Sequence, residues 1–364
     1  MRRVSTKYLQ PGMKIARNVY NSNGKVLLAA GMIITQGYIE RLTELGIASV
    51  YVNDGVFDGL ENIPDVISEQ SRQETTKLVK ASFEALEANR QINLRAVRKS
   101  VDTIIDELLA NRDVLFHLVD IRSYDDYTFS HSVNVCILSL MTAITLGYDH
   151  LKLKELGIGA LLHDIGKTRI DKSILNKPGE LNAEELEIVR QHPQHGYEIL
   201  RTYDDVPLLS AHVSFQHHEC WGGKGYPRGL SGEHIHEYAR IAAVADVYDA
   251  LLADRPYRPA YSINQAVTII SRMSNSFFEP RAVAALISNI ATFPIGSVVL
   301  LSSGQVGMVV DVNKNAPTRP IIRVLYDQYS RRLRNPHEID LTRLSTVFIT
   351  KTLSEEEILS LIKS

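Results

Sequence analysis

The chain has 364 residues, of which 45% are hydrophobic and 23% are charged, and its formal net charge is −2. This length predicts two or three domains, and the composition is that of a soluble globular protein with a large core. The balance of 40 basic and 42 acidic residues gives no support for a nucleic acid polymer or a membrane surface as the partner.

Cysteine use and hydropathy favour the cytoplasm. Cys136 and Cys220 lie far apart, so no disulfide framework is expected. Residues 1–10 lack the apolar core of a signal peptide. The longest apolar stretch, Val133–Gly147, is interrupted by polar residues and is too short to span a bilayer. We therefore expect it to be a buried helix, and we expect no membrane insertion.

Residues 1–55 predict a small, β-rich N-terminal α+β domain. Thr35 is the expected N-cap of a helix over Gln36–Leu45. The segment has no cluster of His, Cys or acidic residues, so we interpret it as a packing or interaction module. Three strands are expected, over Met13–Val19, Lys25–Ala29 and Ala48–Val52.

Residues 56–100 predict a linker followed by a helical segment. Asn53–Pro64 is rich in Gly, Asp and Asn, which is typical of a linker. Val66–Val119 contains few helix breakers. Its apolar stripe packs either on the following domain or in a dimer seam. The stripe consists of Val97, Val101, Ile104, Ile105, Leu108 and Leu109.

Residues 101–295 predict an all-α domain, because helical segments alternate with Gly, Pro and Asn breaks and strand-like alternation is nearly absent. Of the twelve histidines, only His117 and His337 fall outside residues 129–293. This uneven distribution suggests a metal site within the helical domain.

Residues 296–364 predict a small C-terminal β domain. A short helix over Ser354–Ile362 is expected to follow its strands. The predicted strands are the β-branched runs Ser297–Leu301, Gly307–Val312, Ile321–Tyr326 and Thr346–Ile349.

The most informative dipeptide is His163-Asp164, which follows an apolar run and precedes Gly166. An imidazole next to a carboxylate can bind a divalent metal, and one carboxylate can bridge two metals. Lys167 would then provide a cation for a phosphate. The alternative is a helix that simply ends in polar residues, because His-Asp alone is a common dipeptide.

Further ligand candidates lie on other predicted helices. Asp246 stands in an otherwise apolar helix, where a buried acid must be paired, hydrogen-bonded or bound to a metal. A single histidine is more often structural, and His195 is more often an exposed neighbour of His192. The candidates are His131, His192, His195, His217, His218 and Asp246.

Taken together, such ligands can converge in a helical bundle and hold two metals. Nitrogen and hard oxygen ligands suit iron, manganese, zinc, nickel or cobalt. Two such metals can share a hydroxide and hold a phosphodiester for in-line attack.

Two motifs carry a resemblance to a known family. His163-Asp164-x-x-Lys167 resembles the HD superfamily of metal-dependent phosphohydrolases, and His217–Pro227, which ends in Gly-Tyr-Pro, is similar to the signature of its HD-GYP subfamily. The match continues through Ala239–Ala250 and Arg255–Arg258 and covers about residues 100–295. The N-terminal unit also resembles a short domain that often precedes HD-GYP modules.

The resemblance implies a helical bundle that hydrolyses the bacterial second messenger cyclic di-GMP to pGpG, or on to GMP, with two divalent ions, iron or manganese first. It places Asp164 as the bridging ligand and Lys167 near the scissile phosphate. The implied metal ligands are His131, His163, Asp164, His192, His217, His218 and Asp246. The implied nucleotide contacts are Tyr226, Asp249, Arg255 and Arg258.

Two positions depart from the family pattern. Some members carry a glutamate four residues before the first histidine and bind a third metal, but this chain has Tyr127 there. We therefore expect a binuclear site. Gly222 stands where an acidic or amide residue is usual, which loosens the loop without removing a ligand.

Three other functions stay open: a cyclic di-GMP binding module with little turnover, which signals to a protein partner or as a homodimer; a phosphodiesterase for cyclic GMP-AMP; and another HD-type nucleotide phosphohydrolase.

Overall fold

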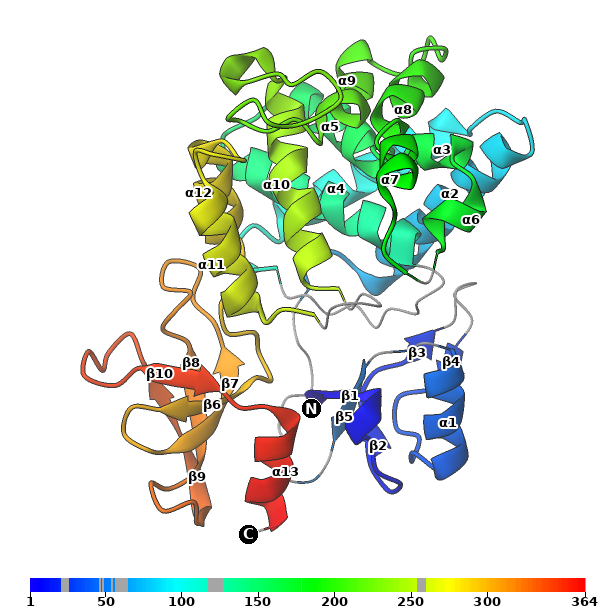
Figure 1. Ribbon diagram of the computed structural model, residues 1–364. Coiled ribbons are helices and arrows are strands. Elements are labelled where there is room, and N and C mark those ends of the chain that lie inside the picture. Colours follow the sequence, from blue (N-terminus) through cyan, green and yellow to red (C-terminus); the bar gives the residue numbers. More distant parts are fainter. Residues whose placement is uncertain are drawn as a thin grey trace. The chain divides into compact units, whose positions relative to one another are not determined.

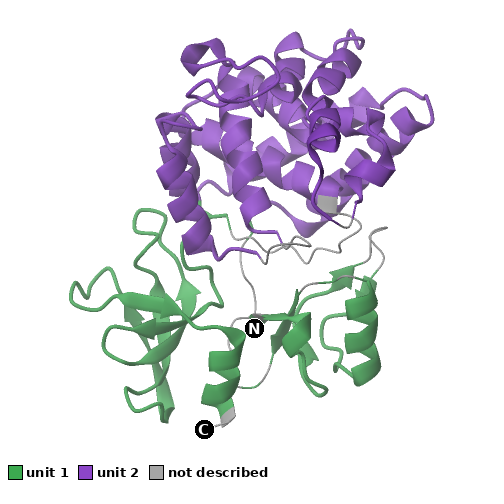
Figure 2. Cartoon of the chain, in the orientation of Figure 1, with its two compact units in different colours: residues 1–65, 113–127, 290–364 green, residues 66–112, 128–289 purple. Residues whose placement is uncertain are grey.

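The computed structural model describes residues 1–20, 26–45, 47, 49–53, 55, 65–116, 127–177, 179–253 and 260–363. Most of the predicted linker Asn53–Pro64 lies outside these ranges. The chain forms two compact units, coloured separately in Figure 2. Unit 1 combines Met1–Asp65, Asp113–Tyr127 and Ile290–Ser364, and unit 2 combines Val66–Arg112 and Thr128–Asn289. The predicted boundaries at 55, 100 and 295 remain predictions.

The N-terminal part of unit 1 contains two small antiparallel sheets and one helix. The first sheet has the order β1-β5-β2, and the second pairs β3 with β4. The Thr35 side chain accepts a hydrogen bond from the Tyr38 backbone N–H, so α1 has the expected N-cap. The elements are β1 (Arg2–Ser5), η1 (Thr6–Tyr8), β2 (Lys14–Ile15), β3 (Val19–Tyr20), β4 (Val26–Leu28), α1 (Gln36–Glu44) and β5 (Ser49–Asn53).

The C-terminal part of unit 1 is an antiparallel sheet of order β10-β6-β7-β8-β9, which confirms the predicted β domain. The sequence did not predict β9, and β10 lies later than expected. The elements are β6 (Val298–Leu301), β7 (Val306–Asp311), β8 (Ile321–Tyr326), β9 (Arg332–Asp340), β10 (Ile349–Thr352) and the helix α13 (Glu355–Lys363).

The two parts of unit 1 share a hydrophobic core. Met1 and Tyr51 belong to the same buried cluster as Val299, Val309 and Val324. A guanidinium nitrogen of Arg2 also lies 2.6 Å from a carboxylate oxygen of Glu355. The first and last described segments therefore fold against each other.

Unit 2 is helical, as predicted (Figure 1). Its helices are α2 (Glu69–Glu87), α3 (Leu94–Ala110), α4 (Tyr127–Thr145), α5 (His150–Leu161), η3 (Ile165–Arg169), α6 (Lys172–Leu175), α7 (Ala183–Val189), α8 (His192–Leu200), α9 (Leu208–Gln216), η4 (Gly232–His234), α10 (Glu237–Leu251), α11 (Ile263–Met273) and α12 (Pro280–Ser288).

The predicted helical stretch after Val66 is two helices rather than one. Asn89, with a φ of 53°, lies in the turn between them. The apolar stripe of α3 is buried except for Leu109, which is half-buried, and α3 packs on α2 and α5. Within this structure the stripe therefore belongs to the core of unit 2.

Helix α4 is the apolar helix expected around Val133–Gly147. Contrary to our expectation, its window Thr128–Thr145 is long and apolar enough to cross a membrane by length and composition alone. However, 72% of that window is buried inside the structure. Its apolar residues are therefore explained by packing in the core of unit 2.

Candidate metal centre

The centre is built around the end of α5, where the chain turns into η3. His163 and Asp164 lie in this turn and are 0% and 2% exposed. An ionised carboxylate buried to this degree requires compensating charges or hydrogen bonds. Those partners come from α4, α8, α10 and the end of α9.

The expected ligands gather in two groups. His131, His163 and Asp164 form one, and the other contains His192, His217 and His218. Within each group the potential ligand atoms lie within 4.8 Å of one another. These six residues come from four stretches of the sequence, around residues 131, 163, 192 and 217. Neighbouring stretches are at least 25 residues apart, as expected for a site assembled by a helical bundle.

Asp164 connects the two groups. Its Oδ1 lies 3.3 Å from Nε2 of His192 and 3.9 Å from Nε2 of His217, and its Oδ2 lies 3.5 Å from Nε2 of His163. A carboxylate that presents one oxygen to each group has the arrangement of a bridging ligand.

Asp246 also reaches both groups. Its Oδ1 is 3.0 Å from Nε2 of His131, and its Oδ2 is 3.9 Å from Nδ1 of His218. This acid thus lies at the centre, although its helix α10 is otherwise mostly apolar.

The Nε2 atoms of His192 and His217 face each other, and a cation between them would be stabilised. Nδ1 of His192 donates to the Val189 carbonyl at 2.7 Å, and Nδ1 of His217 donates to the Ser214 carbonyl at 2.8 Å. In the neutral rings these donors leave Nε2 without a proton. The two Nε2 atoms lie only 3.3 Å apart, so their lone pairs face the same small region. A bound cation would relieve that repulsion.

His163 gives a second test of fit. Its Nδ1 donates to the Ala160 carbonyl at 2.8 Å. Its Nε2 is buried and has no hydrogen-bond partner among the described residues. The Asp164 oxygen at 3.5 Å is too distant for a good hydrogen bond. Buried polar atoms are rarely left in this state, which is explained if Nε2 is a metal ligand.

Burial keeps three of the imidazoles neutral and ready to coordinate. It lowers the pKa of His192 to about 3 and that of His218 to about 4, and it holds the pKa of His217 well below the usual range. For Asp164, burial acts to raise the carboxyl pKa, but Lys167 and His163 outweigh it and hold the pKa well below its usual value. Neutral nitrogens around an ionised carboxylate are the ligand state that divalent metals require.

His131 differs from the other four histidines because two carboxylates flank it. Burial alone would lower its pKa, but hydrogen bonds to Asp246 and Asp249 raise the pKa to about 9. Nδ1 of His131 lies 2.7 Å from Oδ2 of Asp249, while Nε2 faces Asp246.

Asp249 was expected to contact the nucleotide, and in the structure its carboxylate also contacts one of the ligand candidates. Its side chain is fully buried, one oxygen contacts His131, and the other accepts a hydrogen bond from the Asn134 amide at 3.0 Å. A carboxylate held in this way can orient a metal ligand, and the contact of Asp249 with a nucleotide stays a prediction.

Lys167 provides the cation nearest to Asp164. Its Nζ lies 2.5 Å from Oδ2 of Asp164, and its side chain remains 29% exposed. The ammonium group is therefore both at the centre and accessible to a ligand.

The loop after α9 presents Tyr226 to the centre. The tyrosine ring stacks on the His218 ring with centroids 4.7 Å apart. Glu219 holds the loop, because its carboxylate accepts the backbone N–H groups of Arg228 and Leu230, each at 2.9 Å. A Cβ on Gly225 would lie only 2.3 Å from the Cys220 nitrogen, so this position has no room for a side chain.

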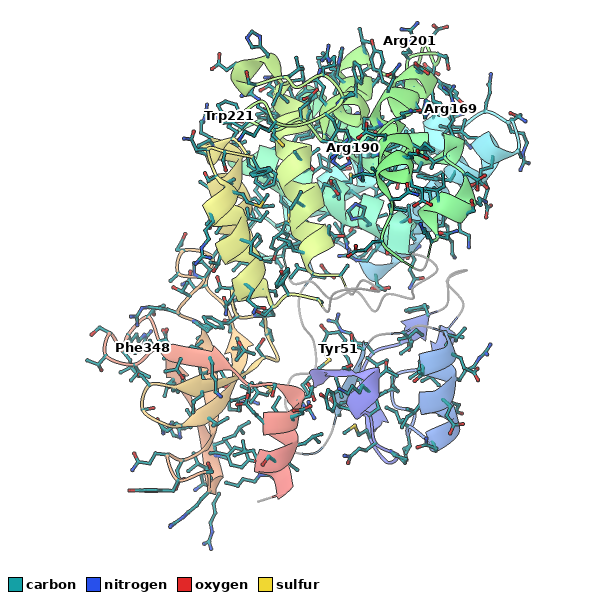
Figure 3. The ribbon with its side chains drawn as sticks, viewed as in Figure 1. Tyr51, Arg169, Arg190, Arg201, Trp221 and Phe348 are labelled. Carbon is teal, nitrogen blue, oxygen red and sulfur yellow. The ribbon has the colours of Figure 1, made fainter. Side chains whose placement is uncertain are left out.

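Arg190, labelled in Figure 3, adds a positive charge beside this loop. Its guanidinium lies 5.4 Å from the centroid of the Tyr226 ring, a cation–π distance.

Not every expected site residue is placed. Arg255 and Arg258 lie outside the described residues, as does the side chain of Tyr127, so the predictions for them stand as they were. His195 belongs to neither ligand group, and its Nδ1 lies 4.0 Å from a Glu198 oxygen.

Comparison with known proteins identifies the family of the helical domain. The sequence profile of the HD domain family matches residues 108–282. The chain is also 36% identical over 243 residues to a cyclic di-GMP phosphodiesterase of Pseudomonas aeruginosa. The aligned region covers 67% of this chain and 58% of that protein. The chain contains an HD domain of the HD-GYP type. The profile of a KOW domain associated with HD domains matches residues 298–361, downstream of the HD-GYP domain.

Two further relatives share the HD-GYP region. A cyclic di-GMP phosphodiesterase of Thermotoga maritima is 37% identical over 181 residues, or 48% of this chain and 49% of that protein. The 3'3'-cGAMP-specific phosphodiesterase 3 of Vibrio cholerae is 37% identical over 169 residues, or 46% of this chain and 36% of that protein. The chain thus spans 36% to 58% of the length of these three relatives.

Two residues of the HD-GYP centre were missed by sequence reasoning. Asn134 lies three residues after His131 on α4, so it shares a helix face with that ligand, and a polar residue in an apolar helix was the available signal. Glu219 was seen as part of the loop motif but was given no role. The structure shows that Glu219 is only 3% exposed, and a carboxylate buried in this way needs hydrogen-bond donors, which the backbone of the loop provides.

Proposed function

We propose that this chain is a metal-dependent phosphodiesterase that hydrolyses cyclic di-GMP to pGpG. The observation that carries the proposal is the arrangement of five imidazoles in two groups, with Asp164 presenting one oxygen to each. The names of the relatives from P. aeruginosa and T. maritima support the substrate.

The residues of the centre have separate roles in this proposal. When bound, two divalent cations activate water as the nucleophile and stabilise charge on the phosphodiester oxygens. His131, His163, Asp164 and Asp246 would hold one cation, and Asp164, His192, His217 and His218 would hold the other. Lys167 neutralises charge that develops on the phosphoryl oxygens.

Substrate contacts come from outside the ligand set. The face of Tyr226 is positioned to contact the nucleotide, and we expect Arg255 and Arg258 to bind its phosphate or guanine groups. Iron or manganese is the expected metal, with zinc, nickel or cobalt as alternatives that the same ligands accept. The cytoplasm is the expected compartment, and a homodimer or a signalling partner is the expected assembly.

Cyclic GMP-AMP is the second candidate substrate. The observation that favours it is the relative from V. cholerae, which is named for that substrate and matches 46% of this chain. The two substrates differ in one base, so the phosphodiester chemistry proposed above applies to both.

The test is to load the protein with Mn²⁺ or Fe²⁺ and to follow cyclic di-GMP and cyclic GMP-AMP separately by chromatography. We expect pGpG from cyclic di-GMP. The variant carrying His163→Ala and Asp164→Ala should give none, whereas His150→Ala, at the exposed start of α5, the helix that precedes these residues, should be as active as wild type.

Tight binding of cyclic di-GMP without metal-dependent product would contradict the enzyme and favour a binding module. Faster turnover of cyclic GMP-AMP would favour the second candidate. Elemental analysis should give two metals per chain, and three would contradict the interpretation of Tyr127.

A further inference from the structure

A buried arginine far from the ligands in sequence is connected to the metal centre. Arg72 lies on α2, before the segment that matches the HD domain profile, and is only 6% exposed. One of its guanidinium nitrogens donates to Oδ1 of Asn134 on α4 at 2.9 Å.

From Asn134 the contacts continue to a metal ligand. The Asn134 amide nitrogen donates to Oδ1 of Asp249 at 3.0 Å, and Oδ2 of Asp249 lies 2.7 Å from Nδ1 of His131. Asn134 and Asp249 are both 0% exposed, and His131 is 5% exposed. Four buried side chains from α2, α4 and α10 thus form one hydrogen-bonded series.

The direction of each hydrogen bond depends on Arg72. A guanidinium can only donate, so it requires the oxygen of the Asn134 amide to face it. The amide nitrogen is then the atom that faces Asp249. If the amide turned over, its oxygen would face a carboxylate oxygen and the contact would become repulsive. Arg72 therefore fixes the orientation in which Asn134 can hold Asp249.

Asp249 in turn fixes His131. By accepting the proton on Nδ1, it leaves Nε2 as the coordinating nitrogen and holds the ring in place. Histidine ligands supported by a carboxylate bind metals more tightly, and loss of such a partner typically weakens metal affinity about 10–100-fold.

We propose that Arg72 is a positioning residue for the metal bound by His131, and that it acts through Asn134 and Asp249. This inference rests on the metal centre of the proposed function but not on its substrate. It also assigns α2 a role in metal binding, although α2 contributes none of the ligands found here among the described residues.

The test measures metal binding directly. Metal-free wild type, Arg72→Leu and Arg72→Lys are titrated with Co²⁺, whose visible absorption reports its ligands, and with Mn²⁺ in competition with a chelator. Arg240→Leu is the matched control, because Arg240 is also largely buried in unit 2 but contacts Glu279 and Trp221 instead.

In wild type we expect two ions per chain. Arg72→Leu should bind one of them about 10–100-fold more weakly, with a changed Co²⁺ spectrum, and the other unchanged. Arg72→Lys, which can still donate to Asn134, should fall between Arg72→Leu and wild type. Arg240→Leu should match wild type.

Wild-type affinity for both ions in Arg72→Leu would overturn the inference, and so would equal weakening in Arg240→Leu. If Arg72→Leu does not fold, judged by circular dichroism, the same criteria apply to Asn134→Leu, which breaks the series at its next member. A wild-type chain that binds no ion would instead contradict the metal centre of the proposed function.

Discussion

Local helix geometry sets the protonation pattern of the ligands. His163, His192 and His217 each donate Nδ1–H to the carbonyl oxygen three residues earlier. The backbone therefore selects the tautomer, and in each ring it leaves Nε2 without a proton and able to coordinate a cation. His131 has the carboxylate of Asp249 in that place and Asp246 at its Nε2, and these two carboxylates move its pKa in the opposite direction.

Lys167 should contribute to the chemical step rather than to metal binding. We expect Lys167→Ala to lower kcat about 10²–10³-fold, because one preorganised charge near the reacting oxygens is lost. Metal content measured by elemental analysis should not fall. A variant that has wild-type kcat but less metal would contradict this role.

The stability of the metal-free chain should be greatest near neutral pH. The folded-state pKa values of His192 and His218 lie below the ordinary value of 6.5, so the unfolded chain binds more protons and stability falls as the pH drops below about 6.5. Each of these two histidines lowers the free energy of unfolding by about 1.4 kcal/mol for each pH unit in that range. The raised pKa of His131 adds stability that is present below about 6.5 and is lost as the pH rises through 9.

Urea unfolding in EDTA at pH 5, 6.5 and 9 would measure this profile. A midpoint at pH 5 as high as that at pH 6.5 would contradict the neutral, buried state of these imidazoles.

The sequence predicted those residues of the centre whose local surroundings were unusual, and it did not predict the partners of the others. Asp246 stood out because an acid in an apolar helix needs a partner. Asp249, only one helical turn later, could not be separated from a nucleotide contact, because only the fold shows which partner each carboxylate has.

At the scale of elements, the centre depends on the close approach of η3 to α8. A Cβ on Gly166 would lie 2.0 Å from the His192 carbonyl oxygen and 2.4 Å from the Gly196 nitrogen. These are backbone atoms and cannot move aside as a flexible side chain could. Only glycine lets the turn that carries Asp164 reach the helix that carries His192.

Gly166→Ala should therefore push α8 away, destabilise the fold by about 1–3 kcal/mol and weaken the metal held by His192. Gly179→Ala is the control, because a Cβ there meets nothing within 4 Å. Chemical denaturation and metal titration would report both effects. Equal behaviour of the two variants would contradict the importance of this approach.

Elements with a strong local pattern were predictable. The strand Ile321–Tyr326 has the bounds expected from sequence, and Thr35 caps α1 as expected. The strand β9 could not be found in this way, because it is a sheet edge whose residues are mostly exposed and polar, so it has no apolar alternation. The strand β1 pairs with β5 across more than forty residues, and no local pattern records that pairing.

At the scale of the whole molecule, unit 1 depends on segments from both ends of the described chain. Arg2 is almost fully buried beside Glu355, whose side chain is 18% exposed. We expect Glu355→Ala to destabilise unit 1 by roughly 1–3 kcal/mol, because a buried guanidinium loses its carboxylate.

Glu338→Ala provides the comparison, since the Arg323–Glu338 pair in the same unit is more exposed and should contribute at most about 1 kcal/mol. Thermal unfolding would measure both variants. A larger loss in Glu338→Ala would contradict the role of the buried pair.

The interrupted path of unit 1 also has a consequence for biosynthesis. A ribosome releases residues 1–65 before unit 2, but their partners in the shared core lie after residue 290. The apolar surface of Met1 and Tyr51 therefore stays partly exposed to water while the whole of the HD-GYP domain is translated. Since domains fold as they emerge, unit 2 has the opportunity to fold before unit 1 is complete.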